Sequence, residues 1–153
     1  MDKLIPTPSA LQKHGYRLGP LTTTLSTAPK TTAIVALKLH KTASDMLSLG
    51  AIDVQTGKVL LDEIYDAEIP GTCCVDLNRC VEQARRDIYK YVNADTILVV
   101  YGGQDELKLL EIVHGRIIDL KVLGVGCVEI LGRDKLVDQA RAMGDIVNGL
   151  LQS

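Results

Sequence analysis

The chain of 153 residues contains no Phe and no Trp, and five Tyr are its only aromatic side chains apart from three His. Proteins that bind single-stranded nucleic acids usually stack bases on aromatic side chains. The formal net charge is −2, so the composition shows no excess of Lys and Arg that would attract phosphates. Both deficits speak against a free-standing binder of nucleic acids.

The sequence also lacks a long apolar segment. No apolar run reaches the length that spans a bilayer, and residues 1–15 contain no uninterrupted apolar stretch of the kind found in signal peptides. We therefore expect a cytoplasmic or nuclear protein without membrane association. With 46% hydrophobic and 24% charged residues, the chain has the composition of a globular domain.

The four cysteines show no zinc-binding pattern. Cys73 and Cys74 are adjacent, Cys80 follows at an unsuitable spacing, and Cys127 has no paired neighbour. Structural zinc sites usually combine two closely spaced ligand pairs. In an intracellular protein these residues are expected to be buried thiols, so the sequence predicts neither a metal nor a cofactor.

Residues 1–30 differ in composition from the remainder. They hold four of the five prolines and the segment TTTLST, which favours an extended N-terminal arm or linker. Residues 31–153 are long enough for one domain with a core. No internal repeat is visible.

The domain has apolar patterns typical of both strands and helices. Three strands joined by short connections indicate an antiparallel meander, and the following strands alternate with helices. Asp76 is the expected cap of the first helix and Asp105 that of the second, which follows Gly102 and Gly103. The strands are expected at 31–39, 45–54, 58–67, 96–101 and 116–123, and the helices at 76–92, 102–113 and 133–151. The order β-β-β-α-β-α-β-α predicts an α/β domain with a mixed sheet and helices packed on it, as in the ribonuclease-H-like fold.

One segment has a specific resemblance. Residues 94–123, ADTILVVYGGQDELKLLEIVHGRIIDLKVL, resemble without gaps the corresponding stretch of Rexo-type 3′→5′ RNA exonucleases of the DEDDh superfamily. Residues 51–65 resemble a hairpin of that family, 138–147 its final helix and 7–20 the arm before its domain. The chain is shorter than the family between residues 69 and 76, where the family binds the terminal nucleotide, and again between 123 and 131.

The resemblance implies a degenerate active site. The family holds two divalent ions with four carboxylates, while a His acts as general base. The first two carboxylate positions fall on Lys38 and His40, the third on Glu106, the His on Asp134 and the last carboxylate on Gln139. One carboxylate cannot hold two hard cations. We therefore expect a pseudo-exonuclease in which Lys38 and Glu106 form a salt bridge across the former site and hold two strands together.

Two matched positions outside this set are expected to be structural. His114 ends a helix in the family alignment, and Asp119 shapes a turn.

Three functions stay open at this point. The first is a protein–protein interaction or scaffold module, as a homodimer or a subunit of a complex, which the family resemblance suggests for RNA processing or silencing. The second is a non-catalytic RNA-binding protein that keeps the substrate groove. The third is a residual metal-dependent 3′→5′ exonuclease built on Glu106, Asp134 and Asp138. Candidate binding residues are the basic side chains of the first and last helices, although such residues usually form a solvated face: Arg85, Arg86, Arg133, Lys135 and Arg141.

Overall fold

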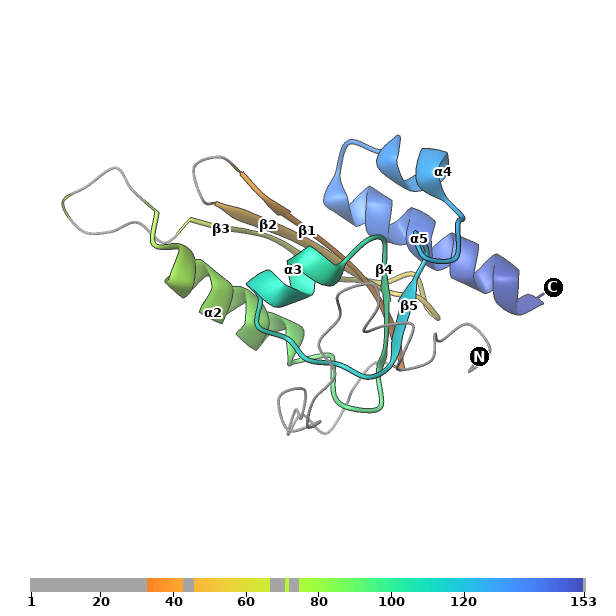
Figure 1. The fold of residues 1–153 in the computed structure, drawn as a ribbon, viewed down its shortest axis with the longest axis horizontal. Coiled ribbons are helices and arrows are strands. Elements are labelled where there is room, and N and C mark those ends of the chain that lie inside the picture. Colours follow the sequence, from red (N-terminus) through yellow and green to blue (C-terminus); the bar gives the residue numbers. More distant parts are fainter. Residues whose placement is uncertain (1–32, 43–45, 67–70, 72–74, 153) are drawn as a thin grey trace.

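The computed structural model describes residues 33–42, 46–66, 71 and 75–152. The expected arm, residues 1–30, lies outside the described residues. The described part is an α/β domain with one five-stranded mixed sheet, as expected, and helices on both faces (Figure 1).

The sheet has the strand order β3-β2-β1-β4-β5. The antiparallel meander is confirmed, since β2 pairs antiparallel with both β1 and β3, whereas β4 runs parallel to β1 and β5 runs parallel to β4. The strands are β1 (Ile34–Lys41), β2 (Leu47–Asp53), β3 (Val59–Tyr65), β4 (Ile97–Val100) and β5 (Ile117–Asp119). The carboxyl ends of β1, β4 and β5 therefore meet at one edge of the domain.

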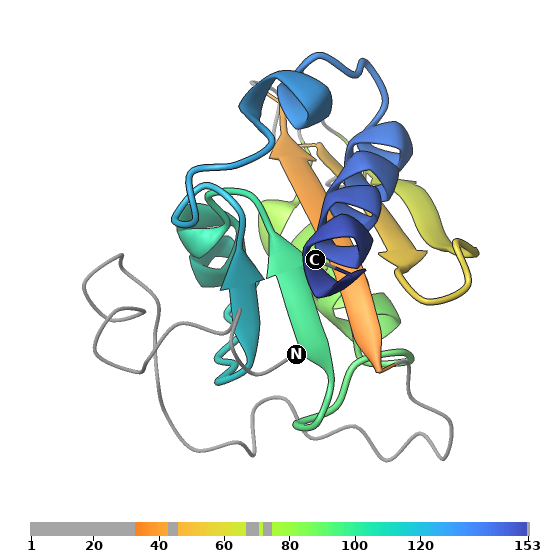
Figure 2. The same cartoon turned by 90° about the vertical axis from the view of Figure 1, so that its right-hand side faces the viewer.

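Two apolar cores lie on opposite faces of this sheet (Figure 2). Because successive side chains of a strand alternate between faces, Val35 and Leu37 pack toward the helices α2 (Leu77–Ile88) and α3 (Gln104–Leu109). Ile34 and Ala36 pack toward α4 (Cys127–Leu131) and α5 (Leu136–Gln152). Lys38 continues the second row, so its side chain starts on the α5 face.

The first helix begins as predicted. The Asp76 carboxylate accepts a hydrogen bond from the Arg79 amide at 3.3 Å, which satisfies one of the free donors at the start of α2. The regular helix ends at Ile88, before the expected Val92, although Val92 is buried against the same core.

Several expected boundaries were wrong. Helix α3 begins at Gln104 after Gly103, so Asp105 lies in its first turn and is not its cap. β5 covers only three of the eight residues expected, because the chain turns after Asp119. The last helix begins at Leu136, three residues late. The short helix α4 was not predicted.

In the described part of the chain, no helix is both long and apolar enough to cross a membrane.

Candidate functional site

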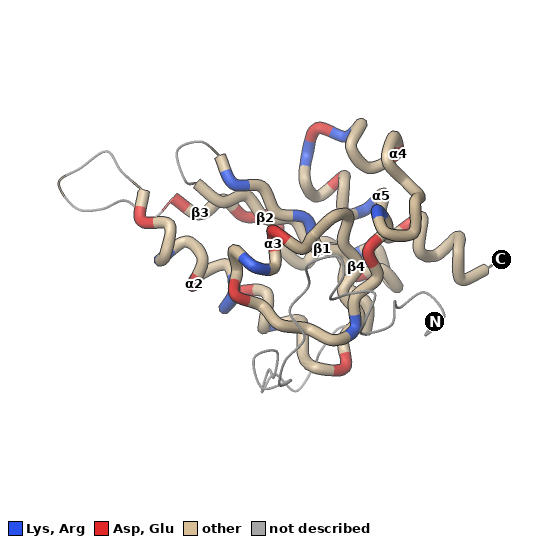
Figure 3. The backbone as a smooth tube through the Cα atoms, in the orientation of Figure 1, with Lys and Arg blue, Asp and Glu red and all other residues tan. Residues whose placement is uncertain are grey.

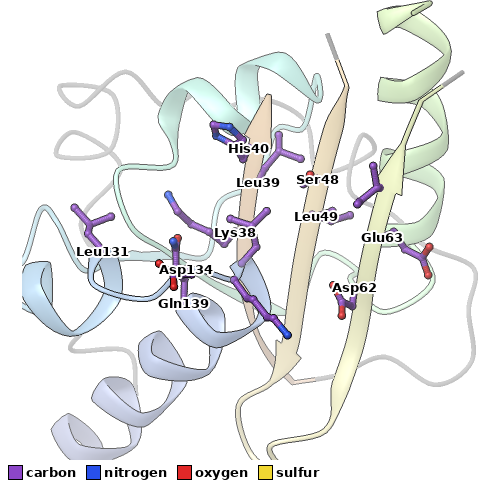
Figure 4. A pocket seen from close by; sticks show the side chains of 13 residues that line it. Lys38, Leu39, His40, Ser48, Leu49, Asp62, Glu63, Leu131, Asp134 and Gln139 are labelled. Carbon is purple, nitrogen blue, oxygen red and sulfur yellow. The ribbon is translucent and has the colours of Figure 1, made fainter. Parts of the chain in front are cut away.

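A hollow of about 670 Å³ lies on the α5 face of the sheet, where β1 ends (Figure 4). Its floor comes from β1 and β2, one wall from β3, and the other from the segment that joins α4 to α5 and the first turns of α5. It is lined by Lys38, Leu39, His40, Ser48, Leu49, Asp62, Glu63, Ile64, Leu131, Asp134, Lys135, Leu136 and Gln139.

Gly50 fixes the border of the hollow. A Cβ atom at this position would lie 2.8 Å from the carbonyl carbon of Leu136 and 2.8 Å from the amide nitrogen of Val137. The first turn of α5 therefore rests directly on the backbone of β2, and only glycine permits this approach. Lys38 is the cross-strand partner of Gly50, so its side chain lies at this border too.

The expected ion pair is confirmed. Lys38 Nζ lies 3.0 Å from Glu106 Oε1, and the two side chains are 14% and 15% exposed. The sequence placed the pair between two strands, which was wrong, because Glu106 belongs to α3. The pair therefore joins the end of β1 to the helix that follows β4.

Burial dominates the electrostatics of this pair. Desolvation raises the pKa of Glu106 above its ordinary value, and the Lys38 charge and hydrogen bond only partly oppose it. The carboxylate of Asp119 raises this pKa further, while the backbone amide of Leu39 lowers it. The Oε2 atom of Glu106 is buried and has no hydrogen-bond partner among the described residues. A buried carboxylate that is satisfied on one oxygen only is expected to take up a proton more readily than an exposed one.

The structure brings together the residues at the positions that the resemblance assigns to the active site. Lys38, His40, Asp134 and Gln139 all line the hollow, and Glu106 reaches Lys38 at its margin. Gln139 donates a hydrogen bond of 2.8 Å to the carbonyl oxygen of Arg133, which holds the chain before α5.

The third open function also needed Asp138, which is exposed and is absent from the lining of the hollow. Among the described residues, no group of three His, Cys, Asp or Glu is arranged to hold a metal ion.

The third strand supplies residues that sequence reasoning missed. Asp62 is the partner of Gly50 and Ile64 that of Ser48, so both point to the same face as Lys38 and His40. Figure 4 shows Asp62 and Glu63 on opposite sides of β3, with Glu63 at the outer margin. The hairpin itself was predicted, and its register was the signal that could have placed Asp62 and Ile64 in the site.

The free charges of the hollow are mostly negative. Asp62 and Asp134 have no ion-pair partner among the described residues, whereas the charge of Lys38 is neutralised by Glu106. Glu63 is the partner of Leu49, so its side chain points to the α2 face and does not add to these charges. Lys135 is the one further Lys or Arg in the lining. Two carboxylates against one ammonium leave one net negative charge among these groups.

Apolar side chains flank these charges. Ile64 on β3 is 65% exposed, and Leu131 across the hollow is 52% exposed. Val128, one turn before Leu131 on α4, is 81% exposed. Exposed apolar side chains gathered at a concave site are typical of an interaction surface.

The predicted basic residues do not form one surface. Arg85 and Arg86 lie on α2, on the sheet face opposite α5, and the basic positions of the two regions lie apart in Figure 3. Arg85 is engaged by the carbonyl oxygen of Leu110 at 2.9 Å and by Glu111 at 3.2 Å.

The basic residues near α5 are also divided. Arg133 donates to the carbonyl oxygen of Glu129, and Arg141 to that of Gly57. Of the five predicted basic residues, only Lys135 lines the hollow.

The two residues expected to be structural have structural contacts. Asp119 accepts hydrogen bonds from the amides of Gly102 and Lys121 at 2.8 and 2.9 Å, which holds the ends of β4 and β5 together. The buried His114 contacts the carbonyl oxygen of Thr96 through Nε2, which must therefore carry the proton. Burial lowers the pKa of His114 and keeps it neutral.

The expectation of buried thiols holds for one of the two described cysteines. Cys80 is buried in the core under α2, but Cys127 is exposed at the start of α4. Cys73 and Cys74 lie outside the described residues.

Comparison with known protein families gives no match, and no curated protein matches the chain either.

Proposed function

We propose that this chain is a non-catalytic, exonuclease-like protein that acts as a protein–protein interaction module. The sheet order β3-β2-β1-β4-β5, in which only β2 is antiparallel, agrees with the ribonuclease-H-like fold that the sequence resembles. The hollow at the end of β1 is the part of that fold to which the resemblance assigns the metal carboxylates.

The observation that carries the proposal is the ion pair between Lys38 and Glu106 at this place. The resemblance implies two divalent cations bound by four carboxylates, and the residues present do not fit them. Lys38 places a positive charge where the family would bind its cations, and it is already paired with Glu106, the one carboxylate that the resemblance retains. Hard cations need several oxygen ligands, so we derive no metal-dependent step from this site.

The surface around the pair favours a protein over RNA as ligand. The net negative charge of Asp62, Asp134 and Lys135 repels phosphates, whereas RNA binding is favoured when Lys and Arg neutralise phosphates and counterions leave the RNA. The exposed side chains of Ile64 and Leu131 fit an apolar anchor residue of a partner protein. The family resemblance suggests RNA processing or silencing as the setting.

The test is to purify the tagged chain from its native cells with and without ribonuclease treatment and to identify the proteins that accompany it. Under the proposal, partners persist after ribonuclease treatment. Replacing both Ile64 and Leu131 with Asp removes the apolar contacts and is expected to lower partner recovery by about tenfold or more. Leu151→Asp is the matched control, because Leu151 is exposed and apolar but lies outside the hollow.

Two results would overturn the proposal. Partners that disappear with the RNA would indicate an RNA-binding protein. Degradation of single-stranded RNA by the pure protein with Mg²⁺ or Mn²⁺, abolished in Glu106→Gln, would indicate a working nuclease.

A further inference from the structure

The charges of the sequence are segregated between the arm and the domain. Residues 1–30 contain four Lys or Arg and one Asp, which gives +3, and residues 31–153 contain the other 13 basic and 18 acidic residues, which gives −5. No acidic residue occurs between Asp2 and Asp45. Such asymmetry within one chain indicates a segment that binds an acidic surface.

The most suitable part of this arm is LQKHGYRL, residues 11–18. It combines the cations of Lys13 and Arg17 with the bulky apolar side chains of Leu11, Tyr16 and Leu18. No other segment of residues 1–32 carries two cations within five residues together with an aromatic side chain.

The hollow is complementary to this segment. Its carboxylates Asp62 and Asp134 have no ion partner among the described residues, and the apolar residues Ile64 and Leu131 beside them are 65% and 52% exposed. We propose that residues 11–18 occupy the hollow of their own chain, with Lys13 and Arg17 facing the carboxylates and Tyr16 packed between the two apolar residues.

The connection is long enough. The arm joins the domain at Ala33, and His40 at the hollow is seven residues further along an extended strand, about 23 Å away. Residues 19–32 supply 14 residues, which span about 46 Å when extended. This is about twice the direct distance, so the connection can pass around α5 or the β3 edge. Because the arm is part of the same chain, its effective concentration at the hollow exceeds that of a free peptide.

The consequence for regulation rests on the proposed function. If a partner protein uses the same hollow, it must displace residues 11–18. The arm would then act as a built-in competitor, weakened by any modification that reduces its positive charge.

The binding itself is tested on the pure, full-length chain by NMR with labelled Ile and Leu methyl groups. We expect nuclear Overhauser contacts between the ring of Tyr16 and the methyl groups of Ile64 and Leu131. The double substitution Lys13→Glu and Arg17→Glu should shift the Ile64 methyl resonance and abolish the contacts. Exchanging Asp62 and Asp134 for Lys in that variant should restore them.

The matched control is Lys3→Glu with Lys30→Glu, which changes the net charge by the same amount outside the segment and should leave the contacts intact. Unchanged Ile64 and Leu131 resonances in all variants would overturn the proposal. So would contacts that appear only between differently labelled chains, since the occupant would then be a second copy. Neither result depends on cellular partners, so this inference and the proposed function can fail separately.

Discussion

Replacing one member of the Lys38–Glu106 pair should lower the free energy of unfolding more than replacing both. At 3.0 Å and an effective dielectric constant near 20, two unit charges attract each other by about 5–6 kcal/mol. The desolvation of two ions that are 14% and 15% exposed offsets several kcal/mol each. The pair as a whole therefore contributes little net stability, whereas a lone buried charge has no compensation.

We expect Lys38→Met and Glu106→Met each to lower the free energy of unfolding by about 2–4 kcal/mol, with the double variant within about 1 kcal/mol of the wild type. Lys38→Met should have the larger effect, because Glu106 Oε2 already lacks a partner among the described residues. The lone carboxylate would then be driven toward its protonated form.

The measurement is urea unfolding followed by far-UV circular dichroism, since the chain has no Trp for fluorescence. Lys108→Met on the exposed side of α3 is the control and should change stability by less than about 0.5 kcal/mol. Additive effects of the two single substitutions would refute the reasoning, because they would mean that solvent screens the pair.

Three further results are expected. The pKa of Glu106 is near 4.5 in the unfolded state and higher in the folded state, so between these two values the folded state binds more protons. The stability of the wild type relative to Glu106→Gln should therefore rise as the pH falls through this range and decline as the pH rises through it. Gly50→Ala should lower the free energy of unfolding by about 1–3 kcal/mol, because the new Cβ would meet the backbone of α5. Gly149→Ala, where a Cβ meets no other atom, should raise it by about 0.5–1 kcal/mol, and thermal unfolding compares the two variants. Tyr65→Phe removes a hydrogen bond of 2.6 Å to Asp87 and should cost about 1 kcal/mol at pH 7. Burial raises the pKa of Asp87, but this hydrogen bond helps to hold that pKa below its ordinary value. The loss of stability in Tyr65→Phe should therefore shrink as the pH falls and Asp87 takes up a proton in both proteins. Urea unfolding at pH 7 and at low pH measures this difference.

The features predictable from sequence are those with local or strongly periodic signals. Asp76 was identifiable as a cap because its contact is three residues away. The three strands before α2 were identifiable because their runs are bounded by short turns. α4 was not, because its five residues are too few to show a helical period and it starts at Gly126 in the left-handed region, with φ 85°.

The residues that form the walls of the hollow could not be predicted from local sequence patterns. A glycine in a strand pattern suggests a close approach of another segment but not which one. Gly50 and the first turn of α5 are 86 residues apart, so only the folded chain shows that they meet. Likewise, a register slip by one residue would turn Asp62 and Ile64 to the other face, and the register of β2 and β3 shifts between Ala51 and Ile52.

This long-range assembly also decides what the hollow can bind. If two carboxylates of β1 were replaced by Lys38 and His40, as the resemblance implies, that change alone would make the site more positive and thus better suited to phosphate. Glu106 cancels the charge of Lys38, and Asp62 from β3 adds a negative charge on the same face. The absence of those carboxylates from β1 therefore does not produce a cationic groove. The result is an acidic hollow with apolar margins, which suits a basic and apolar peptide better than a nucleic acid.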